Sequence, residues 1–361
     1  MGRQGSLVGM IGPLMVAALV TLLAVVVQGA TSGAINDIII LFGINAILVV
    51  GFQSFAGNTG IMSFGHVAFM AVGAYTAGIL AIPVTLKPIV LPSLPGFLSH
   101  VELSTFWTLL VAGLVASAVA LVAGFAIMRL SGTGASIATL GMLVIVNNVL
   151  SQAHAITRGP QSFFGVPQDA SFGWVFGSLI VVVALSAWMK WSGIGLRSRA
   201  VRDDMMAAEA SGAKRVASRL WPFVLSGFIT GVGGGLYAKD LTAFSPDSFF
   251  ISQVVGVLVM AIIGGLSSIS GALVGATVIS VLVEILRNLE AGIPVGSLVV
   301  QAPAGISQAV LGVVLILMLR WRPAGITGPL ELEIDPRRWR VPGGRSRIQL
   351  GSTPPPRSGP K

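Results

Sequence analysis

Residues 106–128 of the chain, FWTLLVAGLVASAVALVAGFAIM, contain no charged side chain. At about 1.5 Å of rise per residue, an α-helix of about 20 apolar residues crosses the roughly 30 Å hydrocarbon core of a bilayer. The rest of the chain has the same character, since 54% of the 361 residues are hydrophobic and 10% are charged. An ordinary soluble domain has about 25% charged residues. The composition therefore predicts an integral membrane protein with many spans.

Ten apolar runs of this kind predict an all-α, polytopic fold with about ten transmembrane helices within residues 1–328. The runs lie at 7–27, 36–52, 61–82, 106–128, 134–151, 173–191, 221–238, 251–265, 268–286 and 303–319. Several are close to the lower limit of length and contain glycine, so we expect short or broken helices among them. The first run is longer than the roughly 7–15 residues of a signal-peptide core, and we predict that it is a retained span.

Charge is concentrated in two segments that flank the apolar runs. Residues 192–220 hold six basic and three acidic side chains, residues 320–361 hold nine basic and three acidic ones, and the remainder carries equal numbers of each sign. Basic residues beside membrane helices favour the cytoplasmic side, so with ten spans we predict that both segments and both termini are cytoplasmic. The same confinement argues against nucleic acid as a partner. Residues 329–361, rich in proline, glycine and arginine, are expected to form a disordered tail.

Side-chain chemistry that would support catalysis is scarce. The sequence has no cysteine, and its three histidines, His66, His100 and His154, are too scattered for a metal cluster. It also lacks the Gly-x-x-x-x-Gly-Lys-Ser/Thr loop that binds nucleotide phosphates. We therefore predict no metal site, no catalytic site and no cofactor bound by this chain.

The charged segment 192–220 contains the pattern of a short helix. Asp203 or Asp204 is suited to cap its amino end, residues 205–210 are good helix formers, and Gly212 suits a left-handed stop. A helix of two turns is marginal alone in water, so we expect it to pack against something. Physical reasoning leaves two possibilities open, the membrane domain of the same chain or a groove on another protein.

Three motifs, taken in order, carry a family resemblance. The first is Gly57-Asn-x-Gly-x-x-Ser-x-Gly-His-x-x-Phe, followed by Gly73-Ala-Tyr. The second is Arg202-Asp-Asp-x-x-Ala-Ala-Glu-Ala-x-Gly, followed by the glycine-rich run from Phe223, and the third is Arg322-Pro-x-Gly-Ile. Together they resemble the membrane subunits of branched-chain amino acid ABC importers. Of the two permease types in this family, the chain is similar to LivM.

The resemblance implies a permease rather than an enzyme, driven by ATP that separate subunits hydrolyse. The implied partners are a second, LivH-like permease subunit, two ATP-binding subunits, an extracytoplasmic solute-binding protein and the lipid bilayer of a bacterial inner membrane. Segment 192–220 is then the loop that couples transport to the ATPase. The residues implied in this coupling are Arg202, Asp203, Asp204, Ala208, Glu209 and Gly212.

Polar side chains within the spans are candidates for the translocation path. They are Asn45, Asn58, Ser63, His66 and Asn147. A broken helix at Gly57–Gly65 would also expose backbone groups to the carboxylate and ammonium of an amino acid. The competing interpretation, favoured for any single residue, is an interhelical hydrogen bond. His66 is the strongest individual candidate for the path.

The expected substrate is a branched-chain or other hydrophobic amino acid. One alternative is a permease for urea or short amides in the same superfamily. The other is an ion-coupled secondary transporter, which usually carries buried acidic residues, whereas only Glu284 lies close to the interior of a predicted span. Glu284 is three residues from Arg287, and this spacing predicts a structural ion pair at a helix end.

Overall fold

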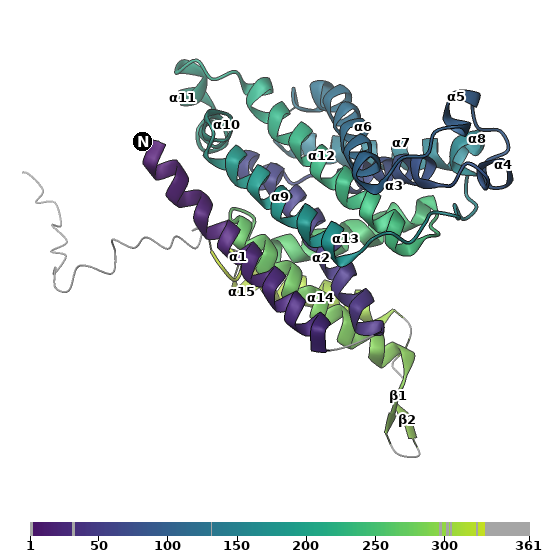
Figure 1. Ribbon diagram of the computed structural model, residues 1–361. Coiled ribbons are helices and arrows are strands. Elements are labelled where there is room, and N and C mark those ends of the chain that lie inside the picture. The colour runs from purple at the N-terminus through teal and green to yellow at the C-terminus, as the bar shows by residue number, and fades with distance from the viewer. Residues whose placement is uncertain are drawn as a thin grey trace, which may run out of the picture.

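The structure is a computed structural model that describes residues 3–30, 33–130, 132–295, 298–300, 303, 305–322 and 324–328. The predicted tail at 329–361 lies outside the described residues. Within the described part of the chain, eight helical segments are long and apolar enough to cross a membrane, and two shorter apolar helices accompany them. The predicted all-α, polytopic fold is confirmed, and Figure 1 shows the helices gathered into one bundle.

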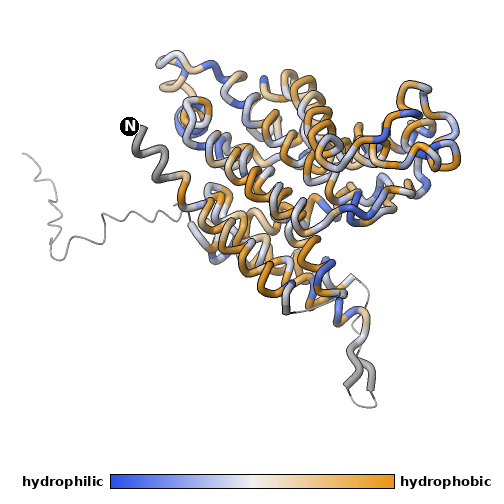
Figure 2. Tube along the Cα trace, in the orientation of Figure 1, coloured by the Kyte–Doolittle hydropathy of each residue, from blue (hydrophilic) through white to orange (hydrophobic). Residues whose placement is uncertain are grey.

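Each of the ten predicted apolar runs overlaps one of these helices. The long ones are α1 (Arg3–Ala30), α2 (Ala34–Thr59), α6 (Thr105–Ile127), α7 (Gly132–Gln152), α9 (Phe172–Trp191), α12 (Arg215–Leu241), the one-turn η1 (Pro246–Phe249) with α13 (Ile251–Gly264), and α14 (Ile269–Ala291). The shorter ones are α3 (His66–Ala81) and α15 (Ile306–Trp321). Hydrophobic residues run along the helices, and hydrophilic ones gather at the segments that join them (Figure 2).

Helix α12 is the centre of the bundle and packs against α2, α3 and α6. Helix α3 is buried on almost every face, as expected for a helix that is apolar all round. Small residues allow these helices to approach closely. A methyl group on Gly73 would overlap the backbone of Gly231, and one on Gly234 would overlap the carbonyl oxygen of Met70. Backbone therefore packs directly on backbone between α3 and α12.

The connections gather at two ends of the bundle. One end, called the α11 end after the short helix α11 (Met205–Ala210), holds residues 60–65, 192–214, 265–268 and 324–328. At this end the Lys190 ammonium donates to the Ser267 carbonyl at 2.6 Å, and Arg219 Nη1 donates to the Leu130 carbonyl at 3.2 Å. These bonds join connections that are far apart in the sequence.

The opposite end, the α4 end, is built from longer loops with short helices. These are α4 (Lys87–Val90), α5 (Gly96–Ser99) and α8 (His154–Thr157). Lys239 is buried here and lies 3.3 Å from an Asp169 carboxylate oxygen and 3.1 Å from Thr105 Oγ1, so it joins α12, α6 and the loop before α9. An antiparallel hairpin of β1 (Ile293–Val295) and β2 (Leu298–Val300), which the apolar pattern did not predict, connects α14 to α15.

The close contact between α3 and α12 yields a stability prediction. Gly234→Ala would place a methyl group against the Met70 carbonyl, which cannot move without its helix, so we expect a cost at the upper end of the about 1–3 kcal/mol typical of overpacking. Gly177→Ala in α9, where no atom lies within 4 Å of the added carbon, is the matched control. Thermal melts of the purified protein in detergent should show a lowered midpoint for the first variant alone. Equal midpoints would contradict the packing described here.

Candidate functional site

Helix α11 (Met205–Ala210) forms where the sequence predicts a short capped helix. Asp204 is the capping residue, and its Oδ1 accepts a hydrogen bond from the Ala207 amide at 3.0 Å. Gly212 has a φ of +85° and ends the helix. The Gly212 amide donates to the Glu209 carbonyl at 2.9 Å and the Ala213 amide to the Ala208 carbonyl at 3.0 Å, the pair of bonds that defines a Schellman stop. The prediction of a capped helix with a glycine stop is confirmed.

Helix α11 projects from the bundle and packs mainly on one neighbour, α10 (Gly193–Asp203) (Figure 1). Ala208 is buried, whereas Glu209 is exposed and the Met206 side chain is 76% exposed. A groove of about 900 Å³ runs between α10, α11 and the start of α12, with the half-exposed Trp221 among its lining residues. This end of the molecule therefore presents a raised helix beside a groove.

Helix α10 was missing from the sequence prediction, which treated 192–220 as a loop with one short helix. The Ser192 hydroxyl caps it by accepting from the Gly195 amide at 3.4 Å. Ser198 Oγ donates to the Ser218 carbonyl of α12 at 2.5 Å, so α10 is attached to the bundle. Helix α12 begins at Arg215 rather than at 221, which leaves only a few residues between the three helices. Residues 192–220 therefore form helices α10 and α11 and the start of α12, and polar residues of α10 have hydrogen-bond partners on the bundle.

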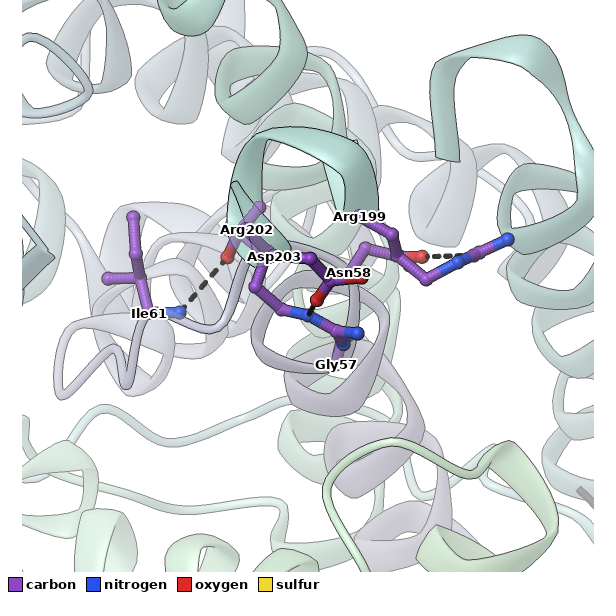
Figure 3. A network of polar contacts seen from close by, with 7 residues as sticks. Gly57, Asn58, Ile61, Arg199, Arg202 and Asp203 are labelled. Carbon is purple, nitrogen blue, oxygen red and sulfur yellow. Dashed lines mark hydrogen bonds and ion pairs between the residues drawn. The ribbon is translucent and has the colours of Figure 1, made fainter. Parts of the chain in front are cut away.

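Two arginines of α10 reach the carboxyl end of α2. Arg202 Nη1 donates to the Gly57 carbonyl at 2.7 Å, and Arg199 Nη1 donates to Asn58 Oδ1 at 2.9 Å and to the Lys190 carbonyl at 2.7 Å. Arg202 Nε also pairs with Asp203 at 2.8 Å. Figure 3 shows both guanidinium groups directed at this turn of α2. The last carbonyls of a helix lack partners within it, and cations are favourable there.

The third motif folds back onto the same end. The Ile326 amide donates to the Ile263 carbonyl at 2.8 Å, and Thr327 Oγ1 donates to the Gly264 carbonyl at 2.8 Å. Gly325 has a φ of +79°, and a methyl group on it would lie 2.6 Å from the Gly265 α-carbon. All three motifs of the sequence therefore meet at the α11 end of the bundle.

His66, the strongest single path candidate, is enclosed by aromatic rings. Its Nε2 lies 2.9 Å from Ser226 Oγ, which also lies 2.8 Å from the Phe223 carbonyl oxygen. Four ring centroids lie 5.3–5.9 Å from the imidazole, those of Phe52, Phe55, Phe69 and Phe223. This geometry joins α3 to α2 and α12 and suits a packing role.

The other path candidates do not form one cluster. Asn58 and Ser63 are buried near the α2–α3 connection, where the Asn58 amide also donates to the Ser54 carbonyl at 2.8 Å. Asn45 lies half-buried within α2. Asn147 lies toward the α4 end, and its Nδ2 donates to the Pro246 carbonyl at 3.0 Å. The break expected at 57–65 is present but begins at Gly60, because α2 continues to Thr59.

Sequence reasoning missed Arg199 and Lys190 as residues of this site. Arg199 and Arg202 are three positions apart, which places them on one face of a helix, so the signal was present once residues 193–203 are taken as helical. Lys190 gave no such signal, because its acceptor is a backbone carbonyl in a distant turn. The ion pair predicted from Glu284 to Arg287 is confirmed at 2.9 Å.

Comparison with known proteins identifies the family of the chain. Residues 34–319 match the profile of the family described as branched-chain amino acid transport system / permease component. The chain belongs to this family. It is thus a transport subunit of the ABC type and a multi-pass membrane protein, which sets aside the ion-coupled secondary transporter.

Curated relatives of this permease include both subunit types. It is 27% identical to the high-affinity branched-chain amino acid permease LivM of Salmonella typhimurium and 28% identical to LivM of Escherichia coli, each over 80% of this chain and 69% of the relative. It is 22% identical to LivH of Salmonella typhimurium over 80% of this chain and 92% of the relative. No solved structure matches the permease.

The enclosure of His66 leads to a prediction that separates packing from transport. Ser226→Ala removes the hydrogen-bond partner of the buried His66 Nε2, so we expect it to destabilise the permease by about 1–3 kcal/mol. His66→Phe keeps an aromatic ring in the aromatic surroundings and should support uptake once the protein is folded. The measurement is solute uptake normalised to the amount of assembled complex. A stable His66→Phe variant without uptake would show instead that the imidazole serves the path.

Proposed function

We propose that this permease forms part of the translocation path of an ATP-driven importer and that α11 is the element that docks onto a separate ATPase subunit. The observation that carries the proposal is the form of α11, a capped and stopped helix that stands out from the bundle with Met206 and Glu209 exposed. A two-turn helix with an outward face of this kind fits a groove on a partner. The lack of a phosphate-binding loop in this chain agrees with hydrolysis on another subunit.

The proposed orientation places the α11 end, with both termini, in the cytoplasm of a bacterial cell. Its support is the excess of basic residues in segments 192–220 and 320–361. The α4 end then faces the extracytoplasmic solute-binding protein. A second, LivH-like permease and two ATP-binding subunits complete the assembly, in keeping with the presence of both permease types among the relatives.

The proposed substrate class is branched-chain or other hydrophobic amino acids, which the printed names of the LivM and LivH relatives support. One further relative is the nucleoside permease NupC of Lactococcus lactis, 35% identical over 22% of this chain. That stretch is short, and the amino acid relatives align over most of the chain. Urea and short amides remain the alternative within the superfamily.

The docking role of α11 predicts the effect of two substitutions. Glu209→Lys reverses an exposed charge, and Gly212→Trp puts a bulky side chain in the left-handed stop. Both should abolish ATPase association and ATP-dependent uptake while the permease still inserts into the membrane. Asp37→Lys, an exposed charge reversal in α2 away from this end, is the control and should keep the ATPase bound. Normal co-purification and uptake with Glu209→Lys would refute the docking role.

The substrate class is tested by the ATPase activity of the assembled complex with its binding protein. We expect leucine, isoleucine or valine to stimulate hydrolysis, and urea, acetamide and nucleosides to leave it at the basal rate. Stimulation by one of the latter compounds alone would replace the amino acid assignment.

A further inference from the structure

We propose that Arg199 and Arg202 are the link that passes movement of α11 to the connection between α2 and α3, and so to the interior of the permease. The inference rests on the proposed docking of α11 to an ATPase. It assigns to these two side chains a positioning role in coupling, separate from the binding of the ATPase itself.

Helix α11 is attached to the rest of the chain mainly through α10. Asp204 is the single residue between the end of α10 and the start of α11, and it caps the latter. Arg215 at the start of α12 reaches the Met205 sulfur at 3.7 Å, a weak contact in comparison with the packing on α10. A displacement of α11 is therefore transmitted chiefly to α10.

Helix α10 is held on the bundle by side-chain hydrogen bonds to α12 and α2. Ser198 ties it to α12, while Arg199 and Arg202 tie it to the last turn of α2 through Asn58 and Gly57 (Figure 3). The Arg202 stem lies on Gly60, where an added methyl group would approach its Cγ to 2.7 Å. The guanidinium bonds are charge-assisted and so stronger than bonds between neutral groups. The bonds of Arg199 and Arg202 thus connect α10 to the last turn of α2, next to the non-helical residues 60–65.

The end of α2 is connected to the interior of the bundle through residues 60–65 and the start of α3. Residues 60–65 follow this turn without helical structure, and the Phe64 amide donates to Thr139 Oγ1 of α7 at 3.1 Å. His66 then starts α3, packed against Phe52 and Phe55 of α2. A cavity of about 130 Å³ beside Gly57, Gly60 and Arg202 leaves room for the contact to shift. Movement at Gly57 and Asn58 therefore reaches α3 and α7 directly.

The test uses the complete importer, with both permeases, both ATPases and the binding protein, reconstituted in proteoliposomes. The quantity measured is solute imported per ATP hydrolysed, for Arg199→Ala, Asn58→Ala and the double variant. We expect each single variant to lower this ratio about tenfold, the order expected for loss of a hydrogen bond to a charged group. The double variant should be no worse than Arg199→Ala, because Arg199→Ala already removes the bond to Asn58 together with the bond to the Lys190 carbonyl. Arg129→Ala, an exposed arginine that follows α6 and does not line the groove beside α11, should leave the ratio unchanged.

A purely structural role would give a different result. Destabilised complexes would lose uptake and hydrolysis in proportion, so an unchanged ratio for Arg199→Ala and Asn58→Ala overturns the proposal. If Arg199→Ala does not fold, Arg202→Lys serves as a second variant, because it retains a cation but shortens the reach to the Gly57 carbonyl, and the same criterion applies to its ratio.

Failure of the docking proposal is distinguishable from failure of the link. Co-purification of the ATPase is measured on the same preparations, and it should be retained in Arg199→Ala and lost in Glu209→Lys. Retention in Glu209→Lys would count against docking through α11. An unchanged solute-to-ATP ratio in Arg199→Ala with the ATPase bound would count against the link alone.

Discussion

A helix leaves its last carbonyl groups without partners inside the helix, and those that are buried need partners from elsewhere in the protein. The end of α2 meets this constraint at Gly57, whose carbonyl accepts from Arg202, and Arg199 adds a bond to the Asn58 side chain. These two bonds can form only when α10 lies against the bundle. It thereby places α11 at the edge, where it is exposed.

The rest of the molecule divides into a tightly packed centre and this polar end. In the centre, α3, α6 and α12 approach so closely at Gly73, Gly231 and Gly234 that side chains are excluded, and such contacts resist deformation. At the α11 end the contacts are long charged side chains on backbone oxygens. A change of shape driven by ATP is accommodated more readily by these side-chain contacts than by the close backbone packing of the centre. The three sequence motifs also meet at the α11 end.

Much of the fold could be predicted from the sequence because a helix that crosses the hydrocarbon core of a bilayer must be apolar along about 20 residues. All ten runs overlap helices, and α11 was predicted with its cap and stop, since Asp204 and Gly212 act locally. Helix α10 was missed because its residues are polar and its stability depends on partners in α2, α9 and α12. His66 shows the same limit, because its aromatic surroundings combine three helices that no local pattern connects.

In the proposed orientation, the α11 end faces the cytoplasm and meets the ATPase there. Because the chain has no cysteine, Met206→Cys and Phe97→Cys each introduce a single thiol, at side chains that are 76% and 75% exposed at opposite ends. A membrane-impermeant maleimide added to intact spheroplasts should label position 97 and spare position 206. Position 206 should react only after permeabilisation, and less when the ATPase is bound. Labelling of position 206 in intact spheroplasts would contradict the account.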